Sequence, residues 1–307
     1  MSIFSGLSAF PVTPADAQGR ADLVALERLL TRLPAAGVDS VGLLGSTGTY
    51  AYLTVSERMR VTESAVSQMS GKTPLIVGIG ALRTDDAAQL ARHAAKAGAD
   101  ALLLAPMSYT PLTEDEVFAH FETVAAASDL PLAIYNNPGT THFCFSLALL
   151  EGLAALPTVQ AVKMPLPGNL TMADDLARLR DALPDGFVIG YSGDWGCAEA
   201  LLEGADAWFS VLGGILPGPC VALARAAMAG DRAKAARIDS TLAPLWALFK
   251  EFGSLRVVYA IVNRLGLSDA QPPRPILPLQ GHALERLETA LDGLARDAGL
   301  DSTTPQN

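Results

Sequence analysis

The sequence predicts an α/β fold: a (β/α)8 TIM barrel with a C-terminal helical extension. Eight short runs rich in Val, Ile, Leu and Ala have the composition of strands in a parallel sheet that is covered on both faces. Segments with helical periodicity separate them, and the strand–helix unit repeats roughly every 20–35 residues. A doubly wound open sheet is the alternative, but eight evenly spaced units favour the closed barrel.

The elements follow in order along the chain. The predicted strands are 6–12, 40–44, 74–79, 99–105, 131–135, 159–163, 187–191 and 207–211. The predicted helices between them are 22–33, 54–69, 84–98, 113–128, 146–156, 171–183 and 194–204. Thr54 and Thr113 stand three residues before Glu57 and Glu116, which is the spacing of a capping box. Three glycines are placed to end helices: Gly37, Gly98 and Gly204.

The pattern changes after the eighth strand. From about residue 222 onward there is no strand signal, only helical periodicity in stretches such as "STLAPLWALFKEFG" and "HALERLETALDGLARD". We therefore expect residues 1–221 to form the barrel with the active site and residues 222–307 to form the helical extension.

Composition and charge restrict the class of protein. Half of the 307 residues are hydrophobic, enough for a large core, and the net charge is −10 without a Lys/Arg cluster. This excludes a nucleic-acid or anionic-membrane surface and favours small molecules or further copies of the chain as partners. Three dispersed cysteines form no CxxC pair, and there is no signal-peptide pattern and no window approaching the ~20 apolar residues of a membrane span. We expect a cytoplasmic protein.

In a (β/α)8 barrel, catalytic residues lie at the carboxyl ends of the strands. Lys163 stands at the end of the predicted strand 159–163, where the apolar run stops. A poorly hydrated lysine amine is a nucleophile that condenses with ketones, and the resulting iminium is an electron sink for making or breaking C–C bonds. The alternatives are a lysine that extends to solvent or one that pairs with an acid.

Tyr135 ends the neighbouring strand, so its phenol opens into the same mouth and could shuttle protons for Lys163. A packed aromatic residue is the alternative. The "GSTGT" loop after the second strand offers Ser46 and Thr47 among glycines that let backbone N–H groups approach an anion. The four histidines show no metal-ligand spacing, and no nucleotide, GxSxG or HExxH motif is present. None of these patterns indicates a metal or nucleotide site.

Three segments carry a family resemblance. "GSTGTYAYLTVSER", "YNNPGTT" and "VKMPLPGN" resemble, in order and on the matching strands, the dihydrodipicolinate synthase / N-acetylneuraminate lyase family of pyruvate-dependent class I aldolases. The resemblance runs from about residue 5 to 280.

This resemblance implies a Schiff base between Lys163 and pyruvate or a pyruvate-derived 2-oxo acid, with Tyr135 as proton shuttle. Ser46 matches the relay hydroxyl and Thr47 the carboxylate binder of the loop that begins at Gly45. It also implies that the backbone carbonyl of Phe209 lies near the substrate. Family members are typically homotetramers and need no metal or organic cofactor for catalysis, so we expect neither here.

The chain departs from the dihydrodipicolinate synthase pattern at substrate positions. The usual arginine after the strand-5 tyrosine is Thr140, and the relay tyrosine after strand 4 is replaced by Ser108, with Tyr109 one residue along. The loop after the lysine lacks the usual acid. There is thus no obvious binding group for a second carboxylate, although Thr140 and Tyr109 remain candidates for substrate contacts.

The leading hypothesis is a Schiff-base lyase acting on pyruvate or a related 2-oxo acid, with an aldehyde as second substrate. Within it, dihydrodipicolinate synthase proper (pyruvate and aspartate semialdehyde, in lysine biosynthesis) competes with an aldolase or dehydratase of 2-keto-3-deoxy sugar acids. Outside it stand a non-catalytic pyruvate-binding regulatory barrel and a phosphate-binding barrel enzyme.

Overall fold

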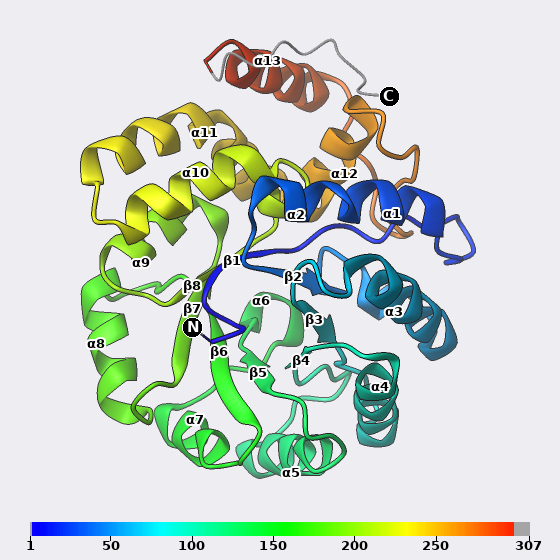
Figure 1. Cartoon of the computed structure of the whole chain (residues 1–307), viewed down its shortest axis with the longest axis vertical. Helices are drawn as coiled ribbons and strands as arrows, with labels where there is room; N and C mark the ends of the chain where they lie inside the picture. The colour runs from blue at the N-terminus through cyan, green and yellow to red at the C-terminus, as the bar shows by residue number, and fades with distance from the viewer. Residues whose placement is uncertain (1, 298–307) are drawn as a thin grey trace.

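The eight apolar runs form eight strands, and each strand is hydrogen-bonded to its sequence neighbours in parallel register. β1 also pairs with β8, which closes the sheet into a barrel (Figure 1). The computed structural model describes residues 2–297. The predicted fold class is confirmed. The strands are β1 (Gly6–Ala9), β2 (Ser40–Leu43), β3 (Leu75–Gly78), β4 (Ala101–Leu104), β5 (Leu132–Tyr135), β6 (Val159–Pro165), β7 (Val188–Ser192) and β8 (Ala207–Ser210).

Helices cover the outside of this ring (Figure 1). The segment predicted as one helix over 22–33 is two helices, which meet at Thr31. A short helix that was not predicted, α6, begins at Pro138, a residue suited to a first helical turn. The helices are α1 (Leu23–Leu30), α2 (Arg32–Ala36), α3 (Val55–Met69), α4 (Thr84–Ala97), α5 (Glu114–Ala125), α6 (Pro138–Thr141), α7 (Leu147–Ala154), α8 (Met172–Ala182), α9 (Cys197–Leu202), α10 (Pro217–Met228), α11 (Arg232–Phe252), α12 (Ser254–Arg264) and α13 (His282–Asp297), with 3-10 turns η1 (Tyr50–Tyr52), η2 (Asp194–Gly196) and η3 (Leu212–Gly214).

The two predicted capping boxes differ. At α5, Thr113 accepts from the Glu116 backbone and the Glu116 side chain bonds back to Thr113, so the box is complete. At α3, Thr54 accepts from the Glu57 backbone at 3.2 Å. The Glu57 side chain, however, turns to Arg60, and this hydrogen-bonded partner lowers the pKa of Glu57. Only half of the second box forms.

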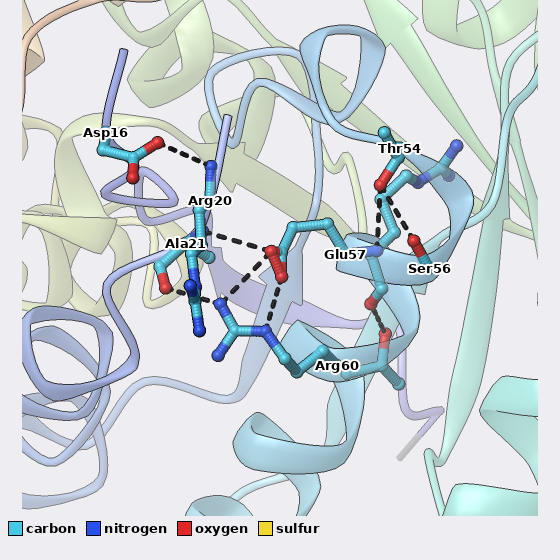
Figure 2. A network of polar contacts seen from close by, with 9 residues as sticks. Asp16, Arg20, Ala21, Thr54, Ser56, Glu57 and Arg60 are labelled. Atoms are coloured by element: carbon cyan, nitrogen blue, oxygen red, sulfur yellow. Dashed lines mark hydrogen bonds and ion pairs between the residues drawn. The ribbon is translucent and has the colours of Figure 1, made fainter. Parts of the chain in front are cut away.

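Glu57 and Arg60 instead fasten the start of α3 to the loop that follows β1 (Figure 2). Arg60 donates to the Ala21 carbonyl at 2.7 Å, and the Ala21 N–H lies 3.4 Å from Glu57 Oε2. The loop itself is closed by Asp16, which accepts from the Arg20 N–H at 2.8 Å. α3 begins directly after the "GSTGT" loop and η1, so this network fixes the far end of that loop.

The apolar side chains form two separate cores. One lies between the strands and the surrounding helices. The other fills the barrel, where small alanines from several strands leave room for large rings, as interdigitation in a narrow barrel requires. The interior cluster is Phe4, Phe10, Ile76, Ala101, Leu103, Ala105, Ala133, Tyr135, Ala161, Val188, Ala207 and Phe209.

Within the described residues, the chain after β8 forms helices and no strand, as predicted, with a non-helical segment between Arg264 and His282. α10 follows β8 as the eighth covering helix, and the division expected at residues 221 and 222 falls inside it. α11, α12 and α13 lie outside the ring, with α13 farthest from the barrel (Figure 1). No helix among residues 2–297 is long and apolar enough to cross a membrane.

Candidate active site

Lys163 lies inside the barrel at the carboxyl end of β6. It pairs in register with Tyr135 of β5 on one side and with Gly190 of β7 on the other. The residue is only 2% exposed. The structure therefore does not support the interpretation of Lys163 as a strand-end residue extending to solvent.

Three aromatic rings surround the Lys163 amine. Nζ is 3.9 Å from the ring centre of Phe10, 4.2 Å from that of Tyr135 and 5.7 Å from that of Phe209. Among residues 2–297, no Asp or Glu oxygen lies within ion-pair distance of Nζ. Ring faces attract a cation but accept no proton and give no strong hydrogen bond. The amine is thus held without a counter-ion, in the setting that suits a lysine nucleophile.

The position of Phe10 depends on two glycines of the neighbouring strand and loop. A Cβ at Gly42 would lie 2.1 Å from the Phe10 ring, and one at Gly45 would lie 2.7 Å from it. Both distances are too short for any side chain. Gly45 therefore acts here as space for the ring beneath the lysine.

Tyr135 and Ser46 form a hydrogen-bonded pair beside Lys163. Their hydroxyl oxygens are 3.2 Å apart, and Asn137 donates its amide N–H to Tyr135 Oη at 2.9 Å. Thr47 follows Ser46 and is 6% exposed. The structure thus brings Lys163, Tyr135 and Ser46 together, and their catalytic roles stay predictions.

The loop holding Ser46 and Thr47 lies between two residues in an unusual backbone conformation. Leu44 has φ 56° and Thr49 has φ 57°. This left-handed region costs a residue other than glycine about 1–2 kcal/mol, and such strain concentrates at functional sites. The strain marks the loop as one whose exact shape matters.

The three remaining residues predicted to contact substrate differ in how deeply they are buried. Phe209 is fully buried and reaches Lys163 through its ring; the role predicted for its carbonyl remains a prediction. Thr140 is exposed on α6, where its hydroxyl donates to the Asn137 carbonyl at 3.3 Å. Tyr109 is 97% exposed, so within one chain it is not packed against the Lys163 site.

Sequence reasoning missed Phe10, Asn137 and Asp194. Asp194 is buried and accepts from the Trp208 indole at 3.0 Å and from the Leu212 N–H at 2.7 Å. Burial raises the pKa of Asp194, while these bonds and the charge of Lys163 oppose the rise. Asp194 therefore fastens η2 to β8 and its following loop, next to Phe209. The available signal was an acid in the short loop "SGDW" that follows the predicted strand 187–191.

No group of three or more His, Cys, Asp or Glu residues within 2–297 could hold a metal ion.

A parallel (β/α)8 barrel with a buried, unpaired lysine on β6 and a tyrosine beside it on β5 defines a class I aldolase-type lyase. The model of the Dihydrodipicolinate synthetase family matches residues 3–294, and the chain belongs to this family. It is an enzyme of the lyase class, as predicted.

Two curated relatives are similar in sequence to this chain along nearly its whole length. The 4-hydroxy-tetrahydrodipicolinate synthase of Leptothrix cholodnii is 35% identical over 94% of this chain and 96% of its own length. That of Pseudomonas putida (strain W619) is 33% identical over 91% and 94%.

Solved structures show the same likeness. A dihydrodipicolinate synthase from Agrobacterium tumefaciens str. C58 superposes with a TM-score of 0.94 at 58% identity, covering 95% of this chain and 98% of that one. The chloride-inhibited dihydrodipicolinate synthase from Acinetobacter baumannii, complexed with pyruvate, gives a TM-score of 0.84 at 27% identity, covering 96% and 99%.

Proposed function

We propose that Lys163 of this enzyme condenses with pyruvate, or with a 2-oxo acid derived from it. The enzyme then joins or cleaves a C–C bond at the carbon adjacent to the resulting iminium. The carrying observation is the burial of Lys163 among three rings without a carboxylate partner, beside the Tyr135 hydroxyl. The pyruvate complex of the Acinetobacter baumannii relative supports the choice of 2-oxo acid.

The reaction starts when the lone pair of Nζ attacks the ketone carbon. Tyr135 passes a proton to the carbinolamine oxygen, which leaves as water while the C=N bond forms. Loss of a proton from the adjacent methyl group gives an enamine, whose carbon adds to an aldehyde. Hydrolysis of the iminium then releases product and free Lys163. Every step runs in reverse for cleavage.

The other residues take supporting roles in this proposal. Thr47, with the backbone N–H groups after Gly45, binds the pyruvate carboxylate, and Ser46 passes protons to and from Tyr135. The carbonyl of Phe209 faces the substrate. Thr140 and Tyr109 contact the second substrate, Tyr109 from a neighbouring copy of the chain, because in a single chain it is directed to solvent.

Borohydride trapping tests the Schiff base. Reduction in the presence of pyruvate should attach the three-carbon acid to the peptide containing Lys163 and leave the peptides containing Lys72 and Lys96 unchanged. Lys163→Ala should show no adduct and no turnover. An unmodified Lys163 in folded protein at saturating pyruvate would refute the proposed function.

The charges of the loops at the barrel mouth indicate which class of second substrate the site accepts. The segments after β4 to β8 (105–113, 136–146, 166–171, 193–196 and 211–216) contain no Lys or Arg. Their one carboxylate, Asp194, is buried and bonded to backbone and indole N–H groups. In these segments a carboxylated aldehyde would find no cation of the kind that a desolvated carboxylate requires. Arg20 and Arg83 stand in the loops after β1 and β3, and Arg83 is paired with Asp85. We therefore propose an uncharged aldehyde, such as one released from a 2-keto-3-deoxy sugar acid.

The names of the relatives favour a different second substrate. Dihydrodipicolinate synthesis from pyruvate and aspartate semialdehyde is the alternative. A panel of aldehydes at fixed pyruvate separates the two. The proposal predicts a higher kcat/KM for neutral hydroxyaldehydes than for aspartate semialdehyde, and the opposite order would establish the alternative. Pyruvate binding without turnover of any aldehyde or 2-keto-3-deoxy acid would instead support the non-catalytic barrel.

We also propose a cytoplasmic homotetramer. All three cysteines are free thiols, which fits a reducing compartment, and the tetramer rests on the family resemblance. Sedimentation velocity at micromolar concentration tests the assembly, and a single monomeric species would contradict it.

A further inference from the structure

Asn137 stands directly between the active-site hydroxyls and α6. It follows β5 by two residues and is the N-cap residue of α6. Its Nδ2 lies 2.9 Å from Tyr135 Oη and 3.4 Å from Ser46 Oγ, and these two oxygens are 3.2 Å apart. The three atoms form a closed triangle in which Asn137 is a common partner of both hydroxyls.

The backbone of Asn137 is held firmly. Its carbonyl accepts from the N–H groups of Thr140 and Thr141, each at 3.0 Å, and from the Thr141 hydroxyl at 3.0 Å. Its amide oxygen lies on the side of Gly139, where an added Cβ would be 3.7 Å away, and its amide nitrogen is within hydrogen-bond distance of both hydroxyls. The side chain is therefore aimed by α6 at Tyr135.

Because an amide nitrogen can only donate, its presence restricts where the Tyr135 proton can point. Nδ2 only donates, so a lone pair of Tyr135 Oη is occupied by the Asn137 N–H. The phenol proton must then point elsewhere, toward Ser46 or toward substrate above Lys163. When the phenol gives up its proton, the same N–H stabilises the charge that develops on the oxygen.

We propose that Asn137 is a positioning residue that sets the direction of proton transfer through Tyr135 and Ser46, an inference that rests on the proposed function. Tyr135 gives its proton to the carbinolamine oxygen, and water leaves as C=N forms. The phenolate, held by the Asn137 N–H, then takes a proton from the carbon next to the iminium and is a phenol again. No proton is lost or gained overall.

Two variants of opposite character test this role. Asn137→Leu removes the donor at similar size, and Asn137→Asp keeps the shape but replaces the donor with an acceptor. We expect kcat to fall by about 10- to 100-fold in Asn137→Leu and further in Asn137→Asp, with KM for pyruvate within about twofold. The pH at which kcat is half-maximal should move upward in both, because an anionic phenol oxygen loses its donor.

Thr141→Val is the matched control. It removes the hydrogen bond from the Thr141 hydroxyl to the Asn137 carbonyl but no bond to the Tyr135 or Ser46 hydroxyls. If Asn137 only held α6 in place, Thr141→Val would change kcat and the pH profile as much as the Asn137 variants do. We expect its pH profile to match that of the wild type.

Borohydride trapping separates the two proposals. If wild-type Lys163 is trapped but Asn137→Leu and Asn137→Asp keep the wild-type kcat and pH profile, the role of Asn137 is refuted and the Schiff base stands. A pH shift shared by Thr141→Val also refutes it. If wild-type Lys163 is never trapped, the proposed function itself fails.

Discussion

Tyr135 and Lys163 lie directly opposite each other on adjacent parallel strands, and the lysine amine is 4.2 Å from the centre of the tyrosine ring. The ring face contacts the amine while the hydroxyl extends beyond it to Ser46. One side chain thus has two functions: it shields the nucleophile from water and ends in the group proposed to move its protons.

The Phe10 ring should matter to the lysine beyond its contribution to packing. Phe10→Leu removes the nearest ring face and should lower the free energy of unfolding by about 1–3 kcal/mol, measured in urea. It should also slow borohydride trapping of pyruvate, because water reaches the amine. Phe4→Leu, equally buried in the barrel interior, is the control and should lose similar stability without slower trapping. Equal trapping rates in both variants would contradict this role.

Ser46 and Thr47 should affect different kinetic constants. Thr47→Val removes a hydrogen bond to the substrate carboxylate and should raise KM for pyruvate by about tenfold or more, with kcat little changed. Ser46→Ala removes a relay hydroxyl and should lower kcat by about 100-fold, with KM little changed. Steady-state kinetics over pyruvate concentration measures both. The reverse split would exchange the two roles.

Thr140 is the position at which a cation could be restored. The residue is exposed, so Thr140→Arg should cost less than about 0.5 kcal/mol in unfolding free energy. It should lower KM for aspartate semialdehyde by about tenfold and leave KM for neutral aldehydes unchanged. Thr140→Gln, which adds a shorter, uncharged hydrogen-bond donor, should leave both values as they are. If the glutamine variant produces the same gain, charge is not the cause.

His120 should make the protein less stable in mild acid. Burial lowers the pKa of His120 below its usual value of 6.5, so the folded protein keeps the imidazole neutral while the unfolded chain takes up a proton. This stabilising contribution is complete above 6.5 and is lost as the pH falls toward the folded value. His120→Gln should therefore show a smaller fall in unfolding free energy between about pH 7 and pH 5.

Urea unfolding at several pH values measures that fall. His282→Gln, which replaces an exposed histidine, is the control and should keep the wild-type dependence. An unchanged slope in His120→Gln would show that other groups cause the acid sensitivity.

The sequence was sufficient to place Lys163 and Tyr135 because both stand where an apolar run ends, and a barrel brings such ends to one mouth. Phe10 was hidden because it lay within the predicted strand 6–12, whereas β1 ends at Ala9. Its contact with Lys163 depends on closure of the sheet and on the space at Gly42, and no local pattern records either.

Other features depend on contacts distant in sequence. The cap at Thr54 is half-formed because the Glu57 carboxylate accepts hydrogen bonds from Arg60 and the Ala21 N–H instead of from the Thr54 N–H. The role of Asn137 depends on which way its amide faces. Composition and spacing specify the helices and strands, but they do not specify which of several possible partners a side chain hydrogen-bonds.

Closure of the sheet also sets when the chain acquires its reactive group. Phe10 belongs to the beginning of the chain and Phe209 to a segment two hundred residues later, and the Phe10 N–H bonds to the Ser210 carbonyl at 2.8 Å as β1 meets β8. In a nascent chain whose β8 segment is still inside the ribosome, Phe209 is missing from the set of rings around Lys163, and β1 has no β8 strand to pair with. We therefore expect Lys163 to react with ketones only after β8 has joined β1 and the aromatic enclosure is complete.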